Sequence, residues 1–279
     1  MVRTILISGC SSGIGLETAR HLARRGWRVF ATARSVFDVE NLAKEGLESL
    51  QMDVDDSASI DLCVDEVLDR TGGRLDAVFS NAGYGQVGAV EDLTREAIRA
   101  QMETNLYGSL ELINRIIPIM RRQGHGRILF NSSVLGYSTL PFRGAYSMSK
   151  WSIEALASTL RLELPRSIHV SLIEPGPITS QFRDNCKPHF LKHIDWQNSL
   201  HRTQYEGQMA RLDKPGPAAP FTLPASAVVE KVVHALEASK PRARYQVTVP
   251  AILFWWLRRL LPTSGMDWVL KKASGGGKR

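Results

Sequence analysis

The sequence has no run of about 18 uninterrupted apolar residues, which a helix needs to span a bilayer. Its opening, MVRTILISG, holds only a short apolar run that ends at Gly9, so we expect no export signal. Cysteine is scarce: Cys10, Cys63 and Cys186 are far apart and form neither a CxxC pair nor a metal-ligand pattern. These absences argue against a spanning helix and predict a reduced, cytoplasmic protein that binds no metal.

Low-complexity segments and an evenly spread basic charge are missing as well. Glycine and proline account for only 22 and 13 of the 279 residues, and 43% of the residues are hydrophobic, which is typical of a globular chain. The net charge of +7 is concentrated between Lys240 and Arg279, where nine basic residues accompany one acid, Asp267. Because the rest of the chain is nearly neutral, we expect no nucleic-acid partner.

Short apolar runs alternate with helical patterns along most of the chain. Strands are expected at residues 4–8, 28–32, 50–54, 77–80, 127–131, 169–174 and 245–249. Helices are expected at 14–25, 57–71, 94–122, 147–164 and 226–239. This alternation predicts an α/β fold, a doubly wound (Rossmann) parallel sheet with helices on both faces.

Two segments depart from this rhythm. Residues 181 to about 222 carry scattered aromatic residues and the run PGPAAP, which is typical of a functional insert, and we interpret them as a substrate lid. Residues 250–279 begin with PAILFWWLRRLLP and end in GGGKR, so we expect a basic amphipathic C-terminal extension with a flexible tail. Since no internal repeat and no clear linker are found, we predict one domain over residues 1–279.

A glycine-rich loop follows the first expected strand. The loop reads Gly9-Cys10-Ser11-Ser12-Gly13-Ile14-Gly15 and opens a helix. Glycines permit a tight turn and close backbone approach to a pyrophosphate, which the positive helix N-terminus attracts. The triplet alone is weak, but a strand before it and a helix after it predict a dinucleotide site.

The end of the second expected strand indicates which dinucleotide binds. Proteins that prefer NAD hold the ribose 2′-hydroxyl with an acid there, and this sequence has Arg34 instead. A guanidinium suits a 2′-phosphate, and Ser11, Thr32 and Ser35 could add hydrogen bonds. We therefore predict NADP(H), preferred over NAD(H).

Tyr146 and Lys150 are four residues apart and so share one helix face. A free phenol has a pKa of about 10, and a nearby cation together with an oxidised nicotinamide would lower it enough for acid–base work. Ser133 lies 13 residues before Tyr146, just beyond an expected strand. YxxxK is common by chance, but in company with Ser133 and the glycine loop it predicts a catalytic site.

The chain resembles the short-chain dehydrogenases/reductases over about residues 3–180. The landmarks that match in order are Gly9-CSS-Gly13-I-Gly15, Asp53-Val54, Asn81-Ala82-Gly83, Asn105, Ser133, Tyr146 with Lys150, and Pro175-Gly176. The stretches ISGCSSGIG and SLIEPGPI are most similar to the branch of retinol and 17β-hydroxysteroid dehydrogenases, and to bacterial NADP-dependent reductases of aldehydes and ketones.

The resemblance implies four catalytic residues. Ser133 would polarise the substrate carbonyl, and Tyr146 would give or take the proton. Lys150 would also bind the nicotinamide ribose, and Asn105 would bend its helix and hold a water that touches Lys150. Ser132 is adjacent to Ser133 and leaves the assignment of the catalytic serine open, although the spacing favours Ser133.

The resemblance also implies cofactor contacts beyond the glycine loop. Asp53 would bind the adenine amino group with the Val54 backbone beside it, Asn81, Ala82 and Gly83 would line the adenosine ribose, and Ile178 would hold the carboxamide after Pro175-Gly176. Ser180 occupies the position of the family's usual threonine, and Thr179 competes with it. Ser8 replaces another usual threonine and could brace the same turn through its hydroxyl.

The expected substrate is an apolar aldehyde, ketone or alcohol. The expected pocket walls, which hold few charges, are Tyr84, Leu135, Tyr137, Phe142, Phe182 and the 181–222 insert. The resemblance implies a homodimer or homotetramer paired through the helices near 94–122 and 147–164, with Leu110, Ile113, Trp151 and Leu160 facing outward or, alternatively, lying in the core. The segment FWWLRRLL would either contact a membrane surface peripherally or pack against protein.

The predicted reaction is hydride transfer between a nicotinamide and a carbonyl carbon. Two alternatives remain at this point: a non-catalytic NADP sensor, and an epimerase or dehydratase of a related branch that also uses YxxxK. The intact set of Ser133, Tyr146, Lys150 and Asn105 weighs against a sensor. The GxxxGxG spacing and the chain length weigh against an epimerase.

Overall fold

Short apolar runs form the strands of a seven-stranded parallel sheet in the computed structural model, which describes residues 2–217 and 219–275. The strands are β1 (Thr4–Ile7), β2 (Arg28–Ala33), β3 (Glu48–Gln51), β4 (Ala77–Ser80), β5 (Gly126–Asn131), β6 (Ile168–Glu174) and β9 (Arg244–Gln246). Their order is β3-β2-β1-β4-β5-β6-β9. The chain therefore reverses its winding between β1 and β4, where doubly wound sheets bind ligands beyond the carboxyl ends of the strands.

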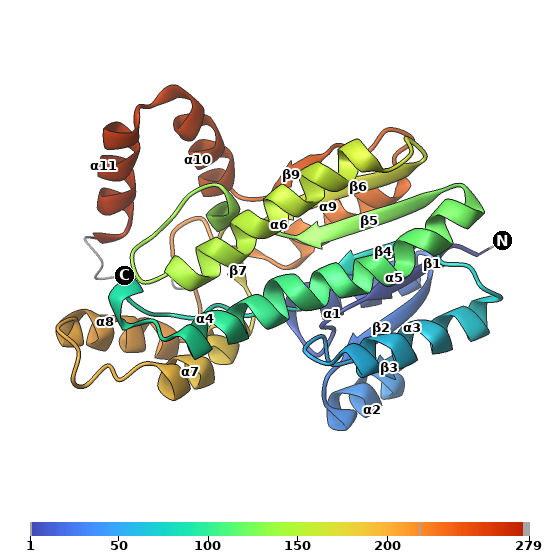
Figure 1. The fold of residues 1–279 in the computed structure, drawn as a ribbon, viewed down its shortest axis with the longest axis horizontal. Coiled ribbons are helices and arrows are strands. Elements are labelled where there is room, and N and C mark those ends of the chain that lie inside the picture. The colour runs from blue at the N-terminus through green and yellow to red at the C-terminus, as the bar shows by residue number, and fades with distance from the viewer. Residues whose placement is uncertain (1, 218, 276–279) are drawn as a thin grey trace.

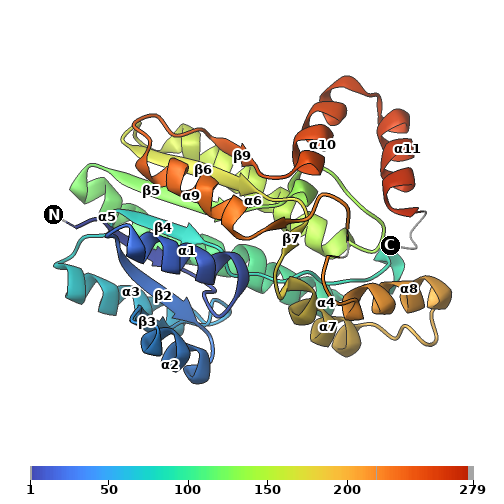
Figure 2. The same ribbon diagram turned by 180° about the vertical axis from the view of Figure 1, so that it is seen from behind.

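Helices cover both faces of this sheet (Figures 1 and 2). One face carries α1 (Gly13–Arg24), α2 (Val36–Lys44) and α9 (Ser226–Glu237); the other carries α3 (Ser57–Thr71), α5 (Gly108–Gln123) and α6 (Gly144–Glu163). Successive side chains of a strand point to opposite faces of the sheet, so each strand contributes to both cores. In β1, Ile5 and Ile7 lie in the core under α1 and α9, and Leu6 lies in the core under α3 and α5. The predicted Rossmann fold is confirmed.

Several element boundaries differ from the expected ones. The helix expected over 94–122 is α4 (Arg95–Met102) and α5 joined by a π-helical turn, Glu103–Tyr107. Helix α2 was not predicted, because it is only nine residues long and begins at the Ser35 cap, whose hydroxyl accepts a bond from the Asp38 N–H. The last strand ends at Gln246, before the expected end, because Thr248 caps the next helix.

The outward apolar residues expected on the long helices are partly core. Ile113 of α5 and Leu160 of α6 are buried in the cluster beneath those helices, so they cannot pair subunits. Trp151 is 37% exposed and is covered by the Arg258 guanidinium, which lies 4.0 Å from its ring centroid. These three side chains stabilise the subunit itself.

The 181–222 segment contains regular structure. It folds into α7 (Phe182–His193) and α8 (Arg202–Asp213), and a two-stranded ribbon of β7 (Ile178–Thr179) and β8 (Leu223–Pro224) joins its ends. Phe190 and Tyr205 are fully buried in a separate apolar cluster, and the Tyr205 hydroxyl donates to Asp92. The two helices lie at the carboxyl end of the sheet (Figure 1), where the crevice opens.

The C-terminal segment forms a helical hairpin, α10 (Val249–Leu260) and α11 (Thr263–Ala273), which projects from the body (Figure 2). Its base is held where the Tyr137 hydroxyl donates to the Ala251 carbonyl at 2.8 Å and Arg258 donates to the Tyr137 carbonyl. Within residues 2–217 and 219–275, no helix has the length and apolar character to cross a membrane. Residues 276–279 of the expected flexible tail lie outside the described residues.

Candidate active site

A cavity of about 1170 Å³ opens where the carboxyl ends of β1, β4, β5 and β6 meet the 181–222 segment. Nearly all predicted site residues line it: Gly9, Ser11, Ser12, Gly13, Ile14, Arg34, Asp53, Val54, Asn81, Ala82, Gly83, Ser133, Tyr146, Lys150, Pro175, Gly176, Ile178 and Ser180. Gly15 and Asn105 lie directly behind the wall. The fold therefore brings residues from seven separate parts of the chain into one site.

The glycine loop forms a bare backbone cradle at one end of the cavity. Gly9 and Gly13 have φ of 70° and 60°, and a Cβ on Gly9 would lie 2.8 Å from the Ala82 Cα. A Cβ on Gly15 would lie 2.2 Å from the Gly9 carbonyl oxygen, so Gly15 permits close packing within the loop. The first turn of α1 contains no acidic residue, and the Ser12 side chain does not cap the helix. The backbone N–H groups of this turn are therefore left for a ligand in the cavity, and they fit a pyrophosphate.

Ser8 and Asn81 brace this loop against the neighbouring strand. The Ser8 hydroxyl accepts bonds from the N–H groups of Asn81 and Ala82, at 2.9 and 3.0 Å. The Asn81 amide donates to the carbonyls of Ser8 and Gly9, and its oxygen accepts from Asn131. Asn81 therefore holds this part of the cavity wall in place, since its side chain is committed to protein partners.

Arg34 is exposed at the end of β2 and lines the cavity. Burial raises the pKa of Asp55, which also lines the cavity, and the charge of Arg34 opposes that rise in part. Thr32 was expected to assist and does not: it is fully buried and its hydroxyl donates to the Ile7 carbonyl. The Ser35 hydroxyl caps α2 and donates to Asp38, so Arg34 is the principal group here that fits a phosphate.

Ser133 and Tyr146 meet at the centre of the cavity. The Ser133 hydroxyl is close enough to the Tyr146 phenol to lower its pKa, and the Ser133 oxygen accepts from the Leu135 N–H at 3.1 Å. The neighbouring Ser132 points the other way and donates to Glu154. The geometry thus separates the two adjacent serines, with Ser133 alone facing the phenol.

Burial controls the protonation of Tyr146. It raises the pKa of the phenol above its usual value, and the Ser133 hydroxyl opposes that rise only in part. Lys150, expected to lower this pKa, is itself buried: its ammonium lies 5.7 Å from the Tyr146 ring centroid and donates to the Asn131 carbonyl at 2.7 Å. Burial lowers the pKa of Lys150 to about 8. The phenol therefore retains its proton at neutral pH.

Asn105 lies in the π-helical turn between α4 and α5 and is buried. Its side chain accepts from the Tyr84 N–H at 3.0 Å and donates to the Tyr84 carbonyl and the Ser149 hydroxyl. A Cβ on Gly83 would lie 2.9 Å from the Asn105 oxygen and 3.7 Å from the Lys150 nitrogen, so these groups are neighbours. Asn105 is a positioning residue, which ties the loop after β4 to the helix that carries Tyr146.

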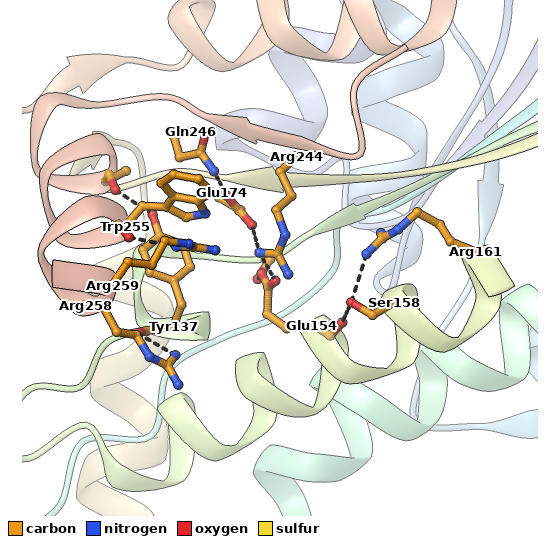
Figure 3. A network of polar contacts seen from close by, with 12 residues as sticks. Tyr137, Glu154, Ser158, Arg161, Glu174, Arg244, Gln246, Trp255, Arg258 and Arg259 are labelled. Atoms are coloured by element: carbon orange, nitrogen blue, oxygen red, sulfur yellow. Dashed lines mark hydrogen bonds and ion pairs between the residues drawn. The ribbon is translucent and has the colours of Figure 1, made fainter. Parts of the chain in front are cut away.

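A buried carboxyl pair behind the site was not predicted. Glu154 lies four residues beyond Lys150 on α6, and Glu174 ends β6; both converge on the Arg244 guanidinium (Figure 3). Glu174 also accepts from Gln246. Because Glu154 accepts from Ser132, the network fixes the chain next to Ser133. The i, i+4 continuation of Tyr146 and Lys150 to Glu154 was the available sequence signal.

Glu174 makes the stability of the fold depend on pH. Burial and the neighbouring Glu154 raise its pKa from 4.5 to about 8. Between these values the unfolded chain releases a proton that the folded chain keeps, so stability falls as pH rises through this window. We expect the Tm of the wild type to fall more steeply from pH 6 to about pH 8 than that of Glu174→Gln.

Thermal unfolding across this pH range measures the difference, and Glu163→Gln, an exposed acid at the end of α6, is the matched control. Parallel curves for Glu174→Gln and the wild type would contradict the assignment of a proton to Glu174.

The expected pocket walls are partly correct. Tyr84, Leu135 and Phe182 line the cavity, and the Phe182 ring lies 5.5 Å from that of Tyr146. His189 of α7 stacks on Tyr84 at 3.5 Å, which closes the wall between them. Tyr137 packs instead beneath α10 through its bond to the Ala251 carbonyl, and Phe142 packs in the apolar cluster under α7 and α8.

The cavity also carries more charge than expected. Three arginines line it near the 181–222 helices: Arg143, Arg183 and Arg211. Sequence reasoning missed them, since α8 was expected to be an irregular loop and only its fold places Arg211 beside Arg143.

Comparison with known proteins places the chain in a family. The sequence model described as short chain dehydrogenase matches residues 3–189. An uncharacterized oxidoreductase of Escherichia coli strain K12, YbbO, is 41% identical over 272 residues, which cover 97% of this chain and 95% of that protein. The chain belongs to the short-chain dehydrogenase family. Human 17-beta-hydroxysteroid dehydrogenase type 1 is 34% identical over 265 residues, which cover 89% of this chain and 78% of the human protein.

Solved structures of the family share the fold of this short-chain dehydrogenase. A short-chain dehydrogenase from Streptomyces avermitilis superposes with a TM-score of 0.74 at 25% identity, over 99% of this chain and 96% of that one. An actinorhodin polyketide ketoreductase with NADPH superposes with a TM-score of 0.73 at 28% identity, over 88% and 95% of the two chains. The chain is therefore an oxidoreductase of a family whose solved structures include nicotinamide complexes.

Proposed function

We propose that this short-chain dehydrogenase interconverts an aldehyde or ketone with an apolar body and the corresponding alcohol, using NADP(H). The observation that carries the proposal is the buried cluster of Ser133, Tyr146 and Lys150 within one cavity, opposite a glycine cradle that fits a dinucleotide. Leu135, Val87 and Phe182 supply apolar walls next to these groups.

Each residue of the cluster has a distinct task. A bound nicotinamide would supply the hydride that reduces the carbonyl carbon. The Tyr146 hydroxyl donates its proton to the carbonyl oxygen, and its raised pKa keeps it protonated until then. The Ser133 hydroxyl holds the same oxygen by a hydrogen bond. The Lys150 ammonium stabilises the negative charge left on Tyr146. Asn105 and Glu154 hold the segments that carry these groups.

The cofactor preference rests on Arg34. Asp53, Val54 and Gly83 line the adenosine side of the cradle, and Pro175, Gly176, Ile178 and Ser180 line the opposite side. A Cβ on Gly13 would lie 3.2 Å from the Ser180 Cβ, so Ser180 faces the glycine loop closely enough to share a ligand with it. The exposed guanidinium of Arg34 favours the 2′-phosphate of NADP(H), and a high cellular supply of NADPH favours reduction.

Isotope transfer tests the reaction. We expect deuterium from NADPH labelled at nicotinamide C4 to appear on the carbinol carbon of the alcohol product, as measured by mass spectrometry. Consumption of the labelled cofactor without deuterium in the product would overturn the assignment. Substrate conversion without net cofactor consumption would instead favour an epimerase or dehydratase.

The assembly and location are also inferred. We infer a homodimer or homotetramer in a reducing, cytoplasmic compartment, supported by family membership and by three unpaired, buried cysteines. Tyr107, in the π-helical turn before α5, and Met148 and Leu162, on α6, are exposed and available to such an interface. Light scattering with size-exclusion chromatography tests this state; a monomer at micromolar concentration would contradict it.

Peripheral membrane contact is inferred for the α10–α11 hairpin. It exposes Ile252, Leu253, Trp256, Leu260 and Trp268, beside the cations Arg259, Lys271 and Lys272. We expect the protein to sediment with anionic phosphatidylglycerol vesicles at low salt and less with neutral ones. Replacing Trp256 and Leu260 with serine should abolish sedimentation; equal recovery on both vesicle types would contradict the inference.

A further inference from the structure

Two arginines at the α7–α8 end of the cavity lack an acidic partner. Arg143 lies just before α6 and Arg211 lies on α8, and both line the cavity. Other arginines of the chain, such as Arg20 and Arg25, have a carboxylate within ion-pair distance. Across residues 2–217 and 219–275, neither Arg143 nor Arg211 has one. An uncompensated pair of cations inside a binding cavity indicates an anion site.

The guanidinium of Arg143 is held in a fixed orientation. One terminal nitrogen donates to the Phe142 carbonyl at 2.9 Å and the other to the Gln208 oxygen at 2.8 Å. Phe142 has a φ of 61°, a left-handed conformation that is costly for an aromatic residue, and its carbonyl also accepts from the Gly88 N–H. The two bonds use two of five donors, which leaves the remaining edge for a ligand.

Arg211 is a second cation, close enough to Arg143 to affect its pKa. Burial and Arg211 lower the pKa of Arg143 to about 10, and burial and Arg183 lower that of Arg211. Cys186 is near both arginines, and burial raises its pKa to about 11, so it is a neutral thiol and does not compensate their charge.

The acids of the nearby helices do not neutralise this pair either. Asp213 forms an ion pair with Lys187, and Asp184 is exposed to solvent. A carboxylate that reaches this pair would therefore find two cations that form no ion pair among the described residues, with the solvent-exposed Asp184 as the unpaired acid on the same cavity wall.

The arginines and the candidate reacting groups line one cavity. Cys186 of α7 is close enough to Tyr146, Arg143 and Arg211 to affect the pKa of each. Val87, Leu135 and Leu212 line the same cavity. A ligand with a polar group at each end and an apolar middle would contact the phenol, these apolar side chains and the two guanidinium groups.

We propose that Arg143 and Arg211 form a carboxylate subsite, so that the substrate is an aldehyde or ketone with an apolar chain that ends in a carboxylate. The inference rests on the proposed function and names its substrate class. The carbonyl is directed to Tyr146 and Ser133, and the carboxylate accepts charge-assisted hydrogen bonds from the two guanidinium groups.

Matched substrates test the proposal. Each ω-oxo carboxylic acid, from succinic semialdehyde to 9-oxononanoic acid, is compared with the unbranched aldehyde of equal length. At the best length we expect kcat/KM to be about tenfold higher for the acid, mainly through KM. In Arg211→Gln this preference should fall by about tenfold, Arg211→Lys should restore part of it, and turnover of the neutral aldehyde should stay the same.

Arg202→Gln, an exposed arginine on the same helix, is the matched control and should keep the preference. A wild-type preference for the neutral aldehyde, or an unchanged ratio in Arg211→Gln, would overturn the subsite. Weaker NADPH binding with an unchanged ratio would assign Arg211 to the cofactor instead.

A binding measurement separates this proposal from the proposed reaction. In the presence of NADP, calorimetry should show octanoate binding the wild type at least about tenfold more tightly than Arg211→Gln, with octanol unaffected. If neutral aldehydes are reduced but octanoate binds both proteins equally, the subsite fails and the reductase stands. If octanoate binding depends on Arg211 but no carbonyl is reduced, the subsite stands and the reaction fails.

Discussion

Replacing Tyr146 with phenylalanine should lower kcat for carbonyl reduction by about a hundred- to ten-thousandfold, the usual contribution of a positioned proton donor. The ring would still fill its place against Phe182, and the cradle of Gly9 and Gly13 is untouched. The loss is therefore chemical, and the Kd for NADPH should stay within about twofold. Steady-state kinetics and fluorescence titration of NADPH measure the two effects.

Tyr245→Phe is the control for Tyr146→Phe. Tyr245 lies on β9, where its hydroxyl accepts from the Arg242 N–H and contacts His234, and it is not among the residues that line the cavity. We expect that variant to keep its kcat. Near-normal turnover in Tyr146→Phe would refute the assignment of the phenol as the proton donor.

Arg34→Ala should produce the second large effect, a loss of cofactor discrimination. Hydrogen bonds to a charged group contribute about 1.5–3 kcal/mol, so the ratio of kcat/KM for NADPH to that for NADH should fall about ten- to hundredfold. The change should appear in the KM for NADPH, because Arg34 lies away from Tyr146 and Ser133, while constants for NADH should remain nearly the same.

Lys44→Ala removes an exposed cation from the neighbouring helix α2 and should leave the ratio unchanged. If the ratio of kcat/KM for NADPH to that for NADH is unaltered in Arg34→Ala, or if kcat/KM falls equally with both cofactors, the guanidinium does not bind the 2′-phosphate.

The central strands and the glycine loop were predictable because their signals are local. β1, β4, β5 and β6 are short apolar runs, and the turn at Gly9 requires a residue that tolerates a positive φ. The edge strand β3 and the short helix α2 have weaker patterns: Glu48–Gln51 is only partly buried. Tertiary context decides such segments, and the expected third strand was consequently placed two residues too late.

The site was predictable in its residues but not in its electrostatics. The spacing of Tyr146 and Lys150 places both on one face, but it does not reveal how deeply the fold buries them. Burial raises the pKa of the phenol and lowers that of the ammonium, and the spacing alone predicts neither effect. The pairings of Glu154 with Arg244 and of Arg143 with Gln208 join segments that are far apart in the sequence, so no local pattern predicts them.

The most direct test of the account is the consumption of NADPH, followed by its absorbance, with a panel of apolar aldehydes, ketones and quinones, and repeated with NADH. We predict rapid oxidation of NADPH with at least one carbonyl and slow oxidation of NADH with the same compound. Tight binding of NADPH without oxidation by any carbonyl would contradict the reductase assignment and favour a protein that binds the nucleotide without catalysis.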